Sequence, residues 1–190
     1  MDADFSIELG NDDPVLDFPW TDPAGKLAYL DLKRHPELIA KIEEAQRFPE
    51  LKEFLCAANS PRTAVETAKC DAWATTELSP EEEIYECSCK FASYVDLVFC
   101  DAARRLSFGA HEDFAGKLVK LLTRATEVAA TLEACIRRCY FERDGSTKDG
   151  FYCTIYVSGF GSDENDARQQ WRMGLKLVQN ALIQLSAEIE

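Results

Sequence analysis

The sequence predicts an α+β fold, with a mainly antiparallel sheet of four to five strands and helices packed chiefly on one face. Three observations lead to this class. Residues 135–161 have the pattern of a β-hairpin, residues 88–100 that of a further strand, and an amphipathic helix follows the hairpin. After residue 60 the expected order is strand, strand, helix, strand, strand, helix. Two hairpin-like ββ pairs separated by helices are typical of the α+β class.

The expected hairpin joins two runs of strand-forming residues through a polar turn at 144–150, which is rich in Asp and Gly. We expect Arg143 to pair with Phe151, which assigns each residue to one of two faces, since facing residues share a face and successive residues alternate. The first face is mostly apolar and carries Cys135, Cys139, Phe141, Phe151, Cys153, Ile155 and Val157, with Arg137 as an exception. The second is polar and carries Arg138, Tyr140, Glu142, Tyr152, Thr154, Tyr156 and Ser158. We expect helices to cover the first face and solvent to reach the second.

Length and charge limit the classes of protein. A chain of 190 residues with 46% hydrophobic residues fits a single α+β domain spanning 1–190. The net charge is −13, from 34 acidic and 21 basic residues. Because nucleic acids and anionic membranes attract concentrated Lys and Arg, this balance argues against both as partners.

The sequence also favours a cytoplasmic location. No apolar run approaches the roughly 20 residues of a membrane span, and the acidic start does not resemble a signal peptide. Eight cysteines are then better interpreted as free thiols than as a disulfide framework.

The first third of the chain is expected to add edge strands and short helices. Residues 5–9 and 15–20 are extended, but neighbouring prolines restrict either piece to a sheet edge. In one arrangement, residues 1–33 form an extended N-terminal arm packed on the body. Pro36 is expected to begin a helix that Pro49 ends, and a second helix follows over 50–58.

The rest of the chain supplies the main sheet and two longer helices. Part of 67–78 is expected to be strand, and Ser79 with Glu82 has capping-box spacing before a helical turn at 80–85. The apolar residues of 88–100 fit helical spacing as well as alternation; their β-branched and aromatic character favours a strand. Helices are expected from near Glu112 and after a cap at Ser162.

No metal or cofactor is expected. The pairs Cys87-x-Cys89 and Cys135-x3-Cys139 lack zinc-ligand spacing, and neither histidine lies in a ligand-like cluster. Buried cysteine usually acts as a small hydrophobic residue, which is the interpretation we favour. The Gly-Phe-Gly sequence at 159–161 precedes acidic residues, which would repel a phosphate at that helix start.

The candidate functional site is the tyrosine-rich face of the sheet. If 88–100 extends that sheet, its members are Lys90, Tyr94, Asp96, Arg138, Tyr140, Tyr152 and Tyr156, with Trp73 at the rim. Tyrosine and arginine are enriched where proteins meet partners, although cross-strand tyrosines also stabilise ordinary solvent-facing sheets.

Two functions are consistent with this face. The first is a non-catalytic module that self-associates through it, as a homodimer. The second is a small-molecule site or enzyme, in which Arg138 holds an anionic group and Asp96 is the candidate base.

Overall fold

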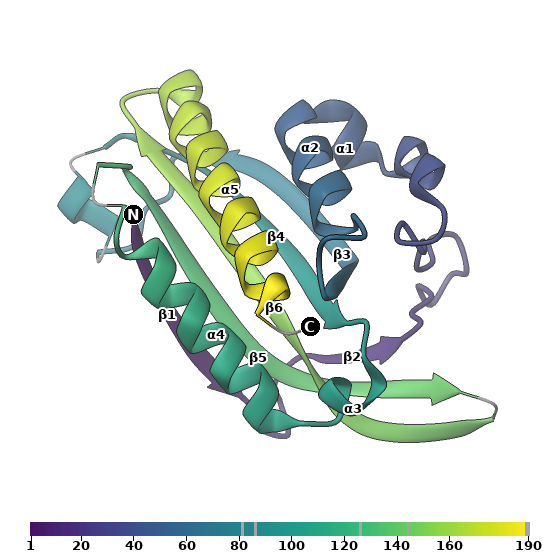
Figure 1. The fold of residues 1–190 in the computed structure, drawn as a ribbon. Coiled ribbons are helices and arrows are strands. Elements are labelled where there is room, and N and C mark those ends of the chain that lie inside the picture. The colour runs from purple at the N-terminus through teal and green to yellow at the C-terminus, as the bar shows by residue number, and fades with distance from the viewer. Residues whose placement is uncertain (81, 86, 126, 144, 189–190) are drawn as a thin grey trace.

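The computed structural model describes residues 1–80, 82–85, 87–125, 127–143 and 145–188. These residues form a six-stranded sheet in the order β1-β5-β6-β4-β3, with β2 also paired to β5 (Figure 1). The strands are β1 (Asp2–Glu8), β2 (Val15–Phe18), β3 (Val65–Thr75), β4 (Cys89–Phe99), β5 (Ala130–Arg143) and β6 (Ser146–Gly161). The predicted α+β class is confirmed, and so is the strand at 88–100.

The sheet is mixed, which corrects the expected mainly antiparallel sheet of four to five strands. β3, β4, β6 and β5 pair antiparallel, but β1 and β2 both run parallel to β5. They follow each other along the same edge, so that Glu8 lies beside Arg137 and Val15 beside Arg138. Both N-terminal pieces therefore lie at a sheet edge, as their prolines predict.

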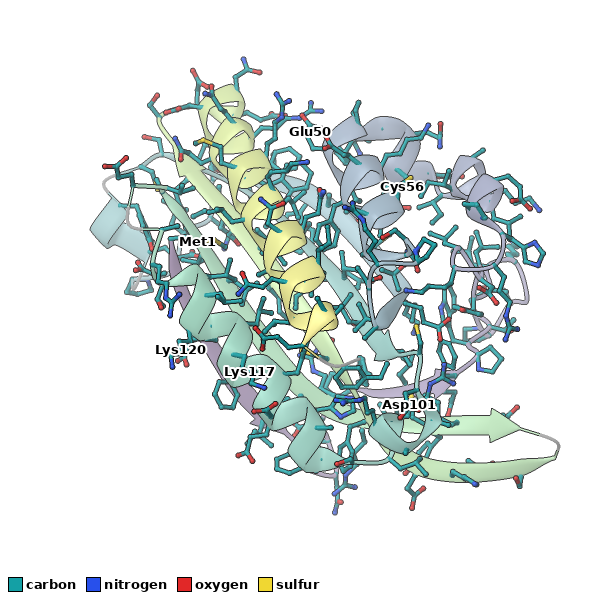
Figure 2. All side chains as sticks on the ribbon, in the orientation of Figure 1. Met1, Glu50, Cys56, Asp101, Lys117 and Lys120 are labelled. Atoms are coloured by element: carbon teal, nitrogen blue, oxygen red, sulfur yellow. The ribbon has the colours of Figure 1, made fainter. Side chains whose placement is uncertain are left out.

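The long helices cover one face of the sheet (Figure 1). The α-helices are α1 (Glu43–Arg47), α2 (Pro49–Ala58), α3 (Ala102–Arg105), α4 (Phe108–Leu122) and α5 (Glu164–Ala187), with 3-10 helices η1 (Pro36–Lys41) and η2 (Glu82–Tyr85). α5 packs so closely on β6 at Gly159 that a side chain there would clash. A Cβ added at Gly159 would lie 2.0 Å from the backbone nitrogen of Trp171. Glu50 of α2, which is labelled in Figure 2, forms an ion pair with Arg168 of α5 at 2.8 Å, so α2 and α5 are joined on the helix side of the sheet.

Several predicted boundaries shift. The helix expected from Pro36 to Pro49 is interrupted at Ile42, which is extended between η1 and α1. The last helix is capped by Asp163, not Ser162, since the Asp163 carboxylate accepts from the backbone N–H of Asp166. The reciprocal half of the predicted capping box is present, with the Ser79 N–H donating to Glu82 at 2.8 Å.

The predicted hairpin exists, but its register is wrong. Arg143 pairs with Ser146 and not with Phe151, a shift of five residues, and the strands extend through most of the expected turn. Because the shift is odd, it exchanges the faces of one strand relative to the other. Tyr152, Thr154 and Tyr156 therefore share a face with Cys135, Arg137, Cys139 and Phe141. The ends of β5 and β6 form an arm that extends beyond the body (Figure 1).

The N-terminal segment covers one end of the face that lacks the long helices. Leu16 and Phe18 of β2 form an apolar cluster there with Val98, Phe141 and Tyr152. The Phe18 ring contacts the Tyr29 ring, with centroids 4.6 Å apart. Residues 15–29 therefore pack on this end of the sheet and bury Tyr152, which we expected to face solvent.

Candidate functional site

The candidate site lies in the middle of the sheet face opposite the long helices. We call this part the open face and define it by Asp71, Trp73, Tyr94, Asp96, Arg137, Thr154 and Tyr156. Residues 15–29 cover one end of it. At the other end Tyr85 of η2 stacks on Phe160, with centroids 4.3 Å apart. The open face lies between these two packed ends. Trp73 is exposed there and Tyr94 and Tyr156 are half-buried, whereas Asp96, Arg137 and Thr154 are buried.

Arg137 is the central cation of the open face. Its Nε donates to Glu8 Oε2 at 2.7 Å, and its Nη1 donates to the hydroxyls of Thr154 and Tyr156 at 3.0 and 3.1 Å. The parallel register of β1 and β5 places Glu8 beside Arg137. Only 8% of Arg137 is exposed, so its charge is balanced inside the protein and not by solvent.

Asp96 continues this network. Its Oδ1 accepts from the Thr154 hydroxyl at 2.6 Å, and only 5% of the residue is exposed. Burial raises the pKa of the Asp96 carboxyl to about 6, although the Thr154 hydrogen bond and the charges of Lys69 and Arg137 oppose that rise. Functional sites often contain a buried carboxyl with a raised pKa. Its chemistry would allow it to gain or lose a proton near neutral pH.

The aromatic residues lie above this polar network. Tyr94 and Tyr156 are register partners on β4 and β6, with ring centroids 6.2 Å apart. Burial, followed by the field of Asp96, raises the pKa of Tyr94 to about 12, so this phenol stays neutral. Trp73 of β3 lies opposite Ala92 and is 38% exposed. Trp73, Tyr94 and Tyr156 together give the open face both apolar surface area and hydroxyl groups.

The structure brings together four of the eight predicted site residues, namely Trp73, Tyr94, Asp96 and Tyr156. Arg138 and Tyr140 do not join them, because the true register places them on the same side of β5 as Ile136, which faces the helices. Tyr152 is buried in the N-terminal cluster. Lys90 is ion-paired with Glu82 at 2.7 Å at the end that η2 covers.

Sequence reasoning missed Arg137, Glu8 and Thr154 as a connected group. One signal was present, since Arg137 was the single charged residue on a face otherwise assigned to the core. A buried arginine requires partners, and its register neighbour Glu8 supplies one. Nothing in the sequence identifies that neighbour, because it lies 129 residues away.

The cysteines are free thiols, as predicted, but Cys135, Cys139 and Cys153 do not share one helix-covered face: Cys153 packs in the core beneath the helices, and Cys135 and Cys139 lie on the opposite face. All eight are free. Cys135, Cys139 and Cys153 are buried, and burial raises the pKa of the Cys135 thiol to about 11 and that of Cys139 to about 12. Such thiols are poor nucleophiles at neutral pH. Within the described ranges, no group of three or more His, Cys, Asp or Glu side chains has an arrangement that could hold a metal ion.

No protein-family model, curated protein or solved structure matches the chain. Among the described residues, none of the helices combines the length and apolarity that a membrane span requires. The functional conclusion therefore rests on the geometry of the open face.

Proposed function

We propose that the protein is a non-catalytic, cytoplasmic binding module that self-associates as a dimer through the open face. The observation that carries the proposal is the grouping of Trp73, Tyr94 and Tyr156 on the uncovered part of the sheet. Large aromatic side chains with polar tips supply contact area at protein interfaces. Eight free cysteines fit a reducing compartment.

The central cation of the open face does not oppose self-association, whereas Asp71 has no ion pair among the described residues. Arg137 is paired with Glu8 within the chain, so its charge needs no external partner. A C2 dimer brings the same patch of two copies together, and internal pairing limits the repulsion between like charges.

Light scattering after size exclusion tests this proposal. We expect the wild type to have twice the 21.4 kDa mass of one chain and the Tyr156→Glu variant to be a folded monomer. Because Tyr156 also accepts a hydrogen bond from Arg137, Trp73→Glu is a second variant without that complication. Tyr140→Glu is the matched control, since Tyr140 is exposed but lies off the open face. A monomeric wild type would refute self-association.

A second candidate function is that of a small-molecule-binding protein or enzyme with its site on the same face. Asp96 favours it, because a buried carboxyl with a pKa of about 6 is suited to proton transfer. Arg138, the expected anion holder, lies on the other side of the sheet, so Asp96, Thr154 and Tyr94 would make the contacts. A thermal-shift screen of metabolites should then find a stabilising compound whose effect Asp96→Asn removes. Finding none would leave self-association as the sole function proposed for this face.

A further inference from the structure

A second feature lies at the β3 edge of the sheet and adjoins the open face, with which it shares Asp71 and Tyr94. A groove of about 510 Å³ has five consecutive β3 residues, 67–71, as its floor. Trp20, Leu27, Leu30 and Ile42 contribute its walls. We call this feature the strand-edge groove.

The floor of the groove is the edge of β3 that faces away from β4, where the Thr67 N–H already donates to Asn59 Oδ1 at 3.0 Å. β3 is the last strand of the sheet, and among the described residues it pairs with β4 alone. An edge strand exposes backbone N–H and C=O groups that can pair with another extended chain. The irregular register between Thr67 and Cys70 and the bond from the Trp20 indole to the Ala68 carbonyl limit pairing near residue 68. Residues 70–75 remain for pairing with a new strand. Cys70 and Asp71 of this segment line the groove, and the rest continues the edge beyond it, where the Ala72 N–H donates to the Asp71 carboxylate at 2.7 Å.

The walls fit the alternation of an added strand. Leu30 and Ile42 pack with the core on the helix side of the sheet, whereas Trp20 packs with the cluster on the opposite side. Side chains of a strand paired with β3 would point alternately to these two sides. Leu27, at 65% exposure, is the most exposed large apolar residue of the groove. Each side therefore offers apolar contact to every second residue of an extended peptide.

The charges of the groove favour a basic occupant. Glu43, Glu44 and Asp71 line it, and none of the three is ion-paired in the part of the chain that the structure describes. Lys41 and Lys69 also line the groove. The Lys69 ammonium lies over the Trp20 ring, 4.9 Å from its centroid, and its charge lowers the pKa of the buried Asp96 carboxyl. The groove thus carries three acidic and two basic side chains on a chain of charge −13, so a cationic segment is attracted to this edge.

We propose that the strand-edge groove binds an extended, basic peptide segment of another protein, which adds to β3 as a further strand. Main-chain hydrogen bonds to residues 70–75 supply the pairing, and the two apolar walls select alternate side chains. The acidic residues of the groove select lysine and arginine over acidic sequences. This inference deepens the proposed binding function by adding a partner, but it does not depend on self-association.

Selection from a random decapeptide library displayed on phage tests the proposal. We expect the recovered peptides to carry an excess of Lys and Arg with β-branched residues between them. Their binding to the full chain should weaken at least fivefold in Glu43→Lys and in Leu27→Ser. Glu112→Lys on α4 makes the same charge change at an exposed residue away from the groove and should change binding less than twofold.

Two further readouts separate strand addition from simple charge attraction. N-methylation of alternate residues in a recovered peptide removes N–H donors but retains its charge, and should abolish binding. Hydrogen exchange should slow at amides within residues 70–75 when the peptide is present. The proposal fails if no peptide is recovered, or if recovered peptides are indifferent to Glu43→Lys or to N-methylation.

The same experiment separates this inference from the dimer. The Tyr156→Glu variant should still bind the recovered peptides, because Tyr156 does not line the groove. A monomeric wild type that binds basic peptides would refute self-association alone. A dimeric wild type from which no peptide is recovered would refute the groove alone.

Discussion

Thr154 donates its hydroxyl proton to the Asp96 carboxylate across the boundary between β4 and β6, at 2.6 Å and away from solvent. Thr154 also accepts a hydrogen bond from Arg137, so one hydroxyl links a buried carboxyl to a buried guanidinium. A hydroxyl can act as donor and acceptor at once, which makes this bridge chemically complete. Asp96, Thr154 and Arg137, on the adjacent strands β4, β6 and β5, therefore form a hydrogen-bonded network beneath the open face.

Asp96→Asn should stabilise the protein at neutral pH. The folded-state pKa of about 6 lies above the ordinary value of 3.8. As the pH rises, the Asp96 carboxyl therefore loses its proton at a lower pH in the unfolded chain than in the folded protein. The stabilisation that neutral Asp96 gives the folded state is present below pH 3.8 and is lost as the pH rises through 6. We expect the variant to exceed the wild type by about 1–3 kcal/mol in free energy of unfolding at pH 7.5, and to approach it at pH 4. Urea denaturation at both pH values measures this; a constant difference would contradict it.

Arg137→Met and Arg138→Met should differ sharply although the residues are adjacent. Removing Arg137 leaves the Glu8 carboxylate and two hydroxyls without their donor, and we expect a loss of about 1–3 kcal/mol, moderated because the Glu8 side chain is 33% exposed. Arg138 is only half-buried, and its substitution should cost less than about 1 kcal/mol. Denaturant unfolding compares the two; equal losses would contradict the register that we describe.

His111 should make the protein less stable in acid. It is buried between Phe99 and Phe151, and burial lowers the pKa of its imidazole. As the pH falls, the imidazole of His111 therefore binds a proton at a higher pH in the unfolded chain than in the folded protein. The stability that neutral His111 gives the folded state is lost as the pH falls below the ordinary pKa of 6.5. His111→Phe should reduce the drop in melting temperature between pH 7 and pH 5.5, whereas the exposed His35→Gln should not. An unchanged drop in His111→Phe would contradict this.

Salt should affect the two proposed contacts in opposite directions. Two chains of charge −13 repel each other, and salt screens that repulsion, with a Debye length of about 10 Å at 0.1 M. Raising the salt from 50 to 500 mM should therefore tighten the dimer and weaken binding of a basic peptide. Analytical ultracentrifugation and fluorescence anisotropy measure the two affinities. Parallel changes would contradict the assignment of opposite electrostatics to the two surfaces.

The local residue patterns predicted which segments form strands, but not how the strands pair. The strand-forming residues of 88–100 correctly predicted a strand despite the helical spacing of the apolar residues. This segment forms β4, which is paired on both sides, with β6 and β3. The hairpin register failed because Ser146–Asp149 are polar and exposed, yet they continue β6 along the arm. A two-residue Asp-Gly connection was available in the sequence and would have given the true register.

The candidate site was half predictable for a similar reason. Tyr94, Asp96 and Tyr156 come from the alternation of two strands, and alternation within a strand survives an error in pairing. Glu8 and Arg137 required the parallel pairing of β1 with β5, which depends on packing across the whole chain. The covering of Tyr152 by residues 15–29 depends on the same long-range packing.

Oxidative footprinting at increasing protein concentration tests the central claim most directly, because it measures which aromatic residues lose solvent when the protein associates. We expect the oxidation rates of Trp73, Tyr94 and Tyr156 to fall together between 1 µM and 100 µM protein, while the rate of exposed Tyr140 stays constant. Constant rates at Trp73, Tyr94 and Tyr156, or a fall confined to Tyr140, would contradict the account.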